Sequence, residues 1–169
     1  MKNLCIIPAR GGSKRIPRKN IKDFLGKPII AYSIEAALKS GMYEEVMVST
    51  DDEEIATIAK QYGASVPFLR SEATANDYAT TADVINEVLD CYSKAGKTFD
   101  SFTCLYSTAP FVSADRLKEA YSLIKNGIYS VFTCVEYSYP IQRALLIVDG
   151  KISMPEHQYL NSRSQDFYK

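Results

Sequence analysis

The sequence has no excess of charge of either sign, because 20 Lys and Arg residues balance 20 Asp and Glu residues. Proteins that bind nucleic acids or membrane surfaces usually carry a basic excess, so neither partner is expected. The sequence also lacks an apolar run of about 18 residues, the length that a membrane-spanning helix needs. Pro8 interrupts the apolar start of the chain too soon for a signal peptide. We therefore expect a cytoplasmic protein.

Histidine and cysteine are scarce as well. The single histidine, His157, lies in a polar stretch, where we expect a solvated side chain rather than a catalytic base. The cysteines do not have the spacing of zinc ligands or of a redox pair; they are Cys5, Cys91, Cys104 and Cys134. Three of them lie in apolar, strand-like runs, where a free cysteine behaves as a small buried hydrophobe. This pattern is typical of a protein with reduced thiols.

The length of 169 residues fits a single domain. Short runs of nearly continuous hydrophobicity alternate with amphipathic segments. Such a pattern predicts an α/β fold with a mostly parallel sheet that helices cover on both faces. We expect strands at residues 4–9, 45–50, 65–69, 102–106 and 130–135, and helices at residues 28–39, 53–62, 82–93 and 115–125.

Several residues indicate where the predicted helices begin and end. Pro28 suits a first helical turn, and Gly41 and Gly63 suit helix ends. The pair at residues 51–52, two aspartates, suits an N-cap better than a metal site. The threonines at residues 80–81 are N-cap candidates for the helix at residues 82–93.

The segment of residues 137–159 departs from the alternation of strands and helices. Asp149 and Gly150 form a favoured hairpin turn between short apolar runs at residues 144–148 and 151–153. Tyr, Leu, Ile and Met residues surround this hairpin, and an exposed apolar patch usually marks an interface. We expect an antiparallel excursion that forms a homodimer. Because the pattern fades after Pro155, we also expect a domain that is incomplete at its C-terminal side.

The most informative segment is the loop of residues 10–20, which directly follows the first predicted strand. Gly11 and Gly12 allow backbone N–H groups to approach an anion without a side chain in the way. The neighbouring cations and hydroxyl group suit a triphosphate; they are Arg10, Ser13, Lys14 and Lys19. Ligands of open α/β sheets bind beyond the carboxyl ends of the strands, which is where this loop lies. The loop therefore predicts a phosphate site.

This loop differs from two common nucleotide-binding motifs. It contains neither the Gly-Lys-Ser/Thr of a P-loop nor the Gly-x-Gly-x-x-Gly of a dinucleotide-binding fold. The absence of the second motif disfavours an NAD-dependent oxidoreductase. A solvated basic turn without a ligand is also disfavoured. Two glycines and several cations directly after a buried strand are costly when no anion binds to them.

Four short motifs, in their order along the chain, resemble the acylneuraminate cytidylyltransferase family, the CMP-sugar synthetases. They are PARGGSK at residues 8–14, KN at 19–20, STD at 49–51 and FLR at 68–70. Three further segments resemble the family members that act on pseudaminic acid: YSTAP at 106–110, IQR at 141–143 and SRSQD at 162–166. The resemblance implies a Rossmann-like, three-layer nucleotide-diphospho-sugar transferase fold. It also implies transfer of CMP from CTP to a nine-carbon acidic sugar, a step in making nucleotide sugars for surface or flagellin glycans.

The resemblance also implies roles for individual residues. Arg10 and Lys14 match catalytic positions. The positions that match nucleotide contacts are Ala9, Arg10, Gly11, Gly12, Ser13, Lys14, Lys19, Asn20, Arg70, Ala79 and Thr80. The candidates for sugar contact are Tyr106, Arg143, Arg163 and Gln165, of which Tyr106 departs from the glutamine more common in the family. Mg²⁺ is the implied cofactor, and in the family its carboxylate ligands come later than residue 169.

Other functions remain open at this level. One alternative is a CTP-binding remnant or interaction module without catalysis. It is favoured because the carboxylates that come late in the family are not among the 169 residues of this sequence. Sialic or legionaminic acid could replace pseudaminic acid, since these sugars differ only in small polar groups and stereochemistry.

Overall fold

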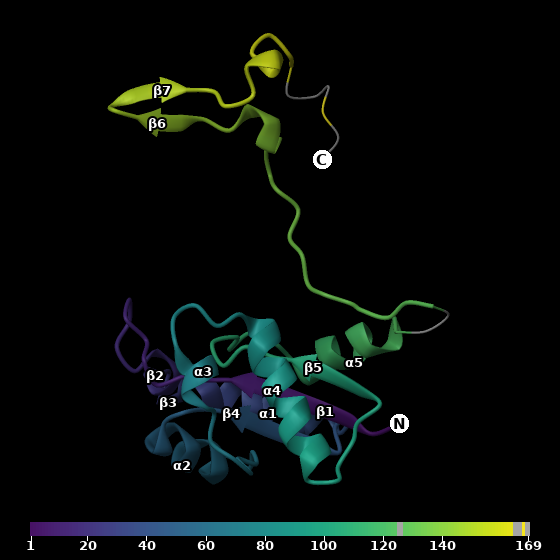
Figure 1. Cartoon of the computed structure of the whole chain (residues 1–169). Coiled ribbons are helices and arrows are strands. Elements are labelled where there is room, and N and C mark those ends of the chain that lie inside the picture. The colour runs from purple at the N-terminus through teal and green to yellow at the C-terminus, as the bar shows by residue number, and fades with distance from the viewer. Residues whose placement is uncertain (125–126, 164–166, 168–169) are drawn as a thin grey trace. The chain divides into compact units, whose positions relative to one another are not determined.

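The computed structural model describes residues 1–124, 127–163 and 167. The chain divides into two units, Met1–Tyr129 and Ser130–Lys169 (Figure 1). In the first unit the elements are β1 (Asn3–Pro8), the 3-10 helix η1 (Lys19–Ile21), β2 (Asp23–Phe24), β3 (Lys27–Pro28), α1 (Ile29–Ser40), β4 (Glu45–Ser49), α2 (Glu53–Gln61), α3 (Glu72–Ala75), α4 (Thr81–Lys94), β5 (Ser101–Cys104) and α5 (Ala114–Ser122). In the second they are η2 (Ile141–Arg143), β6 (Leu146–Val148), β7 (Lys151–Ser153) and η3 (His157–Tyr159).

The central sheet of the first unit is parallel and has the strand order β4-β1-β5. β1 lies in the middle, where Cys5 pairs with Val46 on one side and Thr103 on the other. Four consecutive residues of β1, from Leu4 to Ile7, are fully buried. This burial on both faces explains why the strand is continuously hydrophobic rather than alternating.

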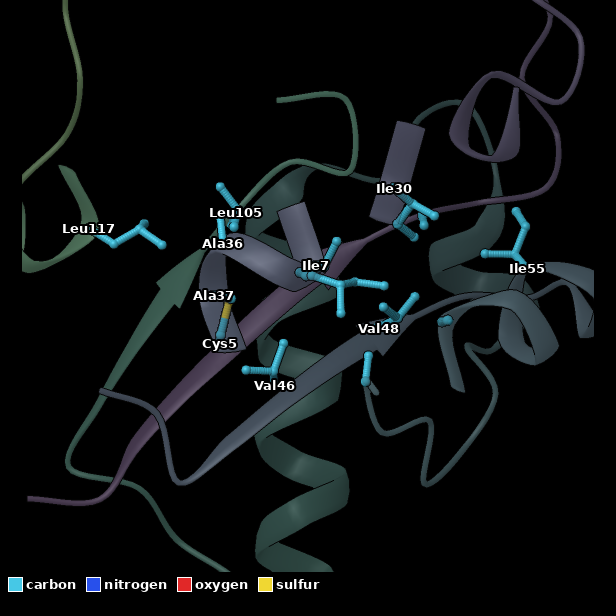
Figure 2. Packing of buried hydrophobic residues seen from close by; sticks show 14 residues of the cluster. Cys5, Ile7, Ile30, Ala36, Ala37, Val46, Val48, Ile55, Leu105 and Leu117 are labelled. Atoms are coloured by element: carbon cyan, nitrogen blue, oxygen red, sulfur yellow. The ribbon is translucent and has the colours of Figure 1, made fainter. Parts of the chain in front are cut away.

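Alternate residues of the strands face two separate hydrophobic clusters. On one face, Cys5 and Ile7 of β1 belong to a cluster with α1, α2 and α5, and Figure 2 shows these side chains together with Ile30, Ile55 and Leu117. On the other face, a second cluster contains residues of the strands and of α4, namely Leu4, Ile6, Met47, Val88 and Tyr92. The sheet is therefore covered by helices on both sides, which confirms the predicted α/β class.

The caps of the helices largely follow the sequence. Asp52 caps α2 by accepting a hydrogen bond of 3.0 Å from the N–H of Ile55, as predicted. Thr80 caps α4 in a reciprocal capping box with Asp83. Gly41 ends α1 with φ of 65°. Pro28 was expected inside the first turn of α1, but it is the N-cap, and the helix begins one residue later.

Two predicted strands are wrong. Residues 65–69 make one isolated bridge, in which Ser65 pairs with Met47. No strand that is longer than this bridge is described there. Pro67 explains this, because proline has no N–H to continue a ladder. Residues 130–135, all described, contain no strand either, and Phe132 and Val135 are exposed. Cys134 is consequently exposed instead of buried as expected.

The short hairpin of β2 and β3 was not predicted from the sequence. Its turn is made by Leu25 and Gly26, which have φ of 53° and 90°. Leucine rarely occupies a left-handed position, so the pair does not have the composition of a favoured hairpin turn.

The second unit contains the predicted hairpin. β6 and β7 pair antiparallel, and Asp149 and Gly150 form the turn with φ of 50° and 72°. All residues of both strands are exposed, and among the described residues of this unit only Met154 is buried. His157 is exposed, in agreement with a solvated side chain. None of the helices in the described part of the chain has the length and apolar character to span a membrane.

Candidate active site

A cavity of about 740 Å³ opens beside the loop that follows β1. The segment after β5 also reaches it, because parallel strands place their carboxyl ends at one edge of the sheet. Residues from α4 and from the segment before it complete the lining. The lining residues are Pro8, Arg10, Ser13, Lys14, Arg15, Ile16, Lys19, Asn20, Arg70, Thr74, Asn76, Asp77, Ala79, Thr80, Thr81, Val84, Tyr106, Ser107 and Thr108.

The two glycines of the loop have different surroundings. The N–H of Gly11 donates a hydrogen bond of 2.8 Å to Oδ1 of Asp51. A Cβ atom on Gly11 would lie 2.7 Å from Oδ2 of Asp52, whereas a Cβ atom on Gly12 would have nothing within 4 Å. Gly11 therefore permits close packing of the loop against the start of α2, and Gly12 leaves open space.

Asn20 holds the loop to the segment that follows β5. Its side chain is buried, donates a hydrogen bond of 2.8 Å from Nδ2 to the carbonyl of Arg10, and accepts one of 2.8 Å from Oγ of Ser107 at Oδ1. Both polar atoms of this buried amide are thus satisfied. The backbone of Arg10 is fixed as a consequence.

Two cations of the loop share one carboxylate. Nη1 of Arg10 lies 2.7 Å from Oδ1 of Asp77 and donates a hydrogen bond of 2.9 Å to the carbonyl of Asn76. Lys14 forms an ion pair with the other oxygen of Asp77. Hydrogen bonds from Lys14 and then Arg10 lower the pKa of the Asp77 carboxyl. A third cation, Lys19, lines the same cavity.

Arg18 has a different role from these cations. It has a left-handed backbone with φ of 54° and forms ion pairs with Asp52 and Glu54 at the start of α2. The hydrogen bond from Arg18 is the main cause of a lowered pKa at Asp52. Together with the contact between Gly11 and Asp51, these ion pairs hold both ends of the loop against α2.

Arg70 brings a buried cation to the cavity from the segment after the Ser65 bridge. Its side chain donates two hydrogen bonds to Ser49, one of 3.0 Å from Nε to Oγ and one of 2.6 Å from Nη2 to the carbonyl oxygen. Burial is the main cause of a lowered pKa of this guanidinium. A buried guanidinium held in this way has a fixed orientation and suits recognition of a polar ligand group.

The start of α4 supplies polar groups to the same cavity. Thr80 is the N-cap of α4, and its Oγ1 accepts a hydrogen bond of 3.2 Å from the N–H of Asp83. Thr81 lies 3.1 Å from the Tyr106 hydroxyl, measured between the two oxygens. Ala79 is placed by a hydrogen bond of 2.9 Å from its N–H to Oδ1 of Asn76. Cations of the β1 loop and polar groups at the start of α4 therefore line the same cavity.

Comparison with known proteins gives the family. A family model described as Cytidylyltransferase matches residues 4–142. The pseudaminic acid cytidylyltransferase of Campylobacter jejuni serotype O:2 is 49% identical over 171 residues, which cover 100% of this chain and 74% of that protein.

The chain belongs to the cytidylyltransferase family. It is accordingly a nucleotidyltransferase by family.

Two further similar proteins are named for other acidic sugars. The CMP-N,N'-diacetyllegionaminic acid synthase of Legionella pneumophila is 48% identical over 128 residues, which cover 74% of this chain and 54% of that protein. A CMP:2-keto-3-deoxy-manno-octonic acid synthetase solved with CTP has a TM-score of 0.60 and 28% identity, and the match covers 72% of this chain and 46% of that one. A 4-diphosphocytidyl-2C-methyl-D-erythritol synthase from Anaerococcus prevotii, at 15% identity and a TM-score of 0.51, shares the fold.

Most residues that the resemblance assigns to the nucleotide line the cavity of this cytidylyltransferase; they are Arg10, Ser13, Lys14, Lys19, Asn20, Arg70, Ala79 and Thr80. Ala9, Gly11 and Gly12 are outside the lining. Ala9 is buried, and its N–H donates a hydrogen bond of 2.9 Å to the carbonyl of Ser49. The roles of all these residues in nucleotide binding stay predictions.

The residues assigned to the sugar fall in different parts of the chain. Tyr106 lines the cavity of the first unit. Arg143 lies in η2 of the second unit and donates a hydrogen bond to the carbonyl of Ser162. Arg163 also belongs to the second unit, and Gln165 lies outside the described residues. Their grouping around one sugar stays a prediction.

The described residues show no cluster of metal-ligating side chains. They contain no group of three or more His, Cys, Asp or Glu side chains that could hold a metal ion. The carboxylates beside the loop have other partners, because Asp51 accepts from Gly11, Asp52 caps α2 and Asp77 pairs with two cations.

Sequence reasoning did not assign several residues of the site, among them Asp77 and Ser107. Asp77 and Ser107 line the cavity and contact the loop through Arg10, Lys14 and Asn20. Both lie in polar, irregular segments, so periodicity gave no reason to select them. The cations that pair with Asp77 lie more than 60 positions away along the chain, so no local signal was available for it.

Proposed function

We propose that this chain transfers CMP from CTP to pseudaminic acid, an acidic nine-carbon sugar, and releases pyrophosphate. The observation that carries the proposal is the 49% identity to a pseudaminic acid cytidylyltransferase over the whole of this chain. The proposal includes the Rossmann-like, three-layer fold of nucleotide-diphospho-sugar transferases. A sheet with helices on both faces and a site at its carboxyl edge supports this fold.

The cavity supports CTP as the nucleotide. Arg10, Lys14 and Lys19 line the side next to the β1 loop and suit three phosphates. Arg70 and Thr80 line the same cavity and match nucleoside positions of the family. A site that hydrogen-bonds one base edge rejects bases that leave its polar groups unpaired. We therefore expect CTP to bind more tightly than UTP or ATP.

The reaction is a displacement at the α-phosphorus. The anomeric hydroxyl oxygen of the sugar forms the new P–O bond, the bond between the α-phosphorus and the bridging oxygen breaks, and pyrophosphate leaves with that electron pair. The hydroxyl proton passes to solvent or to a base. Arg10 and Lys14 offset the negative charge that develops on the phosphates. Mg²⁺ would add further charge stabilisation when bound with CTP.

We also propose a homodimer formed through residues 137–159, and the cytoplasm as the compartment. Leu146, Ile147 and Ile152 of the hairpin are more than half exposed. An isolated two-stranded hairpin is marginally stable in water, so this one needs a surface to pack against. A second copy of the chain provides that surface. Light scattering should then give twice the mass of one chain at micromolar concentration, and a monomer would contradict the proposal.

A pyrophosphate-release assay tests the reaction. The chain is mixed with CTP, Mg²⁺ and, separately, pseudaminic, legionaminic or N-acetylneuraminic acid. We expect release with pseudaminic acid above the other two sugars. Lys14→Ala should weaken CTP binding by about 1.5–3 kcal/mol, because a charge-assisted contact to phosphate is lost, and unchanged affinity in calorimetry would argue against the loop as the phosphate site.

The same assay separates the alternatives. Faster release with legionaminic acid would transfer the assignment to that sugar, for which the 48% identity to the Legionella enzyme is the supporting observation. Tight CTP binding without release for any of the sugars would favour a nucleotide-binding module.

A further inference from the structure

We propose that Asp77 is an internal counter-ion that pairs with Arg10 and Lys14 on the phosphate side of the cavity and is displaced when the triphosphate binds. The inference rests on the proposed function, since it takes the ligand to be CTP. It assigns Asp77 a role in ligand selection that acts through the two cations.

The geometry of the ion pairs is the first support. Each carboxylate oxygen of Asp77 contacts a different cation, with Oδ1 2.7 Å from Nη1 of Arg10 and Oδ2 on Lys14. These are the two loop cations whose positions match catalytic ones in the family. A carboxylate and a phosphate accept hydrogen bonds from the same N–H donors of Arg and Lys. The two anions therefore compete for these donors. The triphosphate has to replace Asp77 to reach these cations.

The position of Asp77 in the chain favours a displaceable carboxylate. It lies in the connection between α3 and α4, next to Asn76, whose Oδ1 accepts hydrogen bonds of 2.8 and 2.9 Å from the N–H groups of Tyr78 and Ala79. The backbone turn is thus held without help from the Asp77 side chain. The side chains of Arg10 and Asp77 are also 32% and 35% exposed, and ion pairs at that exposure are weak.

A comparison with Asp52 separates this contact from structural ion pairs. Asp52 also pairs with a loop cation, Arg18, but its side chain is only 20% exposed and caps α2 as well. Removal of that carboxylate would damage a helix. Asp77 caps no helix, and it is the single acidic residue among the described residues that line the cavity. Its neutralisation should therefore change ligand binding more than folding.

The consequence is a selection by ligand charge. A ligand with several phosphate charges competes successfully with one carboxylate, and a ligand without phosphate does not contact the cations at all. We expect Asp77 to lower the affinity for phosphate-bearing ligands and to leave cytidine unaffected.

The test is calorimetry of the full chain without Mg²⁺, with CTP, inorganic pyrophosphate and cytidine as probes. Asp77→Asn should bind CTP and pyrophosphate about twofold to fivefold more tightly than the native chain, because a weak competing ion pair is gone. Asp77→Glu keeps the charge and should restore the native affinity. Asp90→Asn is the matched control, since Asp90 is an exposed aspartate of α4 outside the cavity lining. It changes the net charge equally and should not change CTP affinity.

A double-mutant cycle with Lys14→Met adds a second criterion. Without Lys14 one of the two partners of Asp77 is gone, so the gain from Asp77→Asn should shrink. A purely structural role of Asp77 would instead give Asp77→Asn a lower melting temperature and weaker CTP binding than the native chain has.

Equal or weaker CTP binding by Asp77→Asn, with the native chain binding CTP normally, would overturn the inference and leave the proposed function intact. A gain that Asp90→Asn reproduces would also overturn it, because net charge would then be the cause. Failure of the native chain to bind CTP would contradict the proposed function and the inference with it.

Discussion

Gly11 and Gly12 are neighbours in the chain, yet the structure gives them different tolerance for a side chain. A Cβ atom at Gly11 would lie 2.7 Å from Oδ2 and 2.9 Å from Cβ of Asp52, which is fixed by α2 and Arg18. Gly11→Ala should therefore destabilise the chain by about 1–3 kcal/mol, the usual cost of overpacking. Gly12→Ala meets open space and should stay within about 0.5 kcal/mol of the native chain.

Urea unfolding of the two variants is the measurement for this pair. Equal destabilisation by both changes would show that backbone freedom, and not contact with Asp52, is what the loop requires of its glycines.

Asn20 is the buried residue on which the position of Arg10 depends. Asn20→Ala removes a donor to the Arg10 carbonyl and the acceptor for Ser107, and it leaves both groups without their partner. The cost should be about 1–3 kcal/mol of unfolding free energy, with weaker CTP binding as well. Ser107→Ala keeps the bond to Arg10 and should weaken CTP binding less. A larger loss of CTP affinity for Ser107→Ala would contradict this assignment.

At the residue scale, the sequence revealed the cations of the site but not their partners. Arg10, Lys14 and Lys19 stand out because they follow a glycine pair after a buried strand. Asp77 is 63 to 67 positions away along the chain, and only the packing of α4 against the sheet brings it to the loop. Long-range pairs of this kind leave no periodic signal in a single sequence.

At the scale of elements, Glu45 joins β4 to the segment after α2 and to α4. It accepts hydrogen bonds from Ser65, Tyr92 and Lys97, and its side chain is 16% exposed. Burial acts to raise the pKa of this carboxyl, but the hydrogen bonds, above all that from Lys97, outweigh it and lower the pKa below its ordinary value of 4.5. The charged form is therefore favoured in the folded chain.

The stability from Glu45 should consequently depend on pH. A carboxyl whose pKa is lower when folded contributes stability that is fully present above its unfolded pKa and is lost as pH falls through the folded one. Glu45→Gln should thus lower the melting temperature at pH 7, and the difference from the native chain should shrink below about pH 4.5. Glu44→Gln, at an exposed neighbour, is the control. A gap between native and Glu45→Gln that stays constant down to pH 3.5 would contradict the linkage.

Elements with a strong local signal were predicted well, and those that depend on a distant partner were not. The helices α1, α2 and α4 have caps or glycine ends that are visible in the sequence. The segment of residues 130–135 has a suitable composition for a strand, but a strand also needs a pairing edge, and none of these residues is paired in a sheet. Composition alone does not show whether such an edge exists.

At the scale of the whole molecule, the two units differ in how much core they have. All residues of both hydrophobic clusters and all residues that line the main cavity belong to Met1–Tyr129. In the second unit, Met154 is the one buried residue among those described. The hydrophobic core and the proposed nucleotide site therefore lie in the first unit, whereas the candidate sugar residues Arg143 and Arg163 belong to the second.

This division predicts the behaviour of a fragment that ends at Tyr129. The fragment should unfold cooperatively and bind CTP within about threefold of the full chain, since it keeps every cavity residue. It should release no pyrophosphate with pseudaminic acid, because the proposed sugar contacts are gone, and it should be monomeric in light scattering. Residues 130–169 alone should show no cooperative transition, because too little apolar surface is buried to offset chain entropy. Loss of CTP binding by the first fragment, in spite of a native-like melting curve, would mean that the second unit contributes to the nucleotide site.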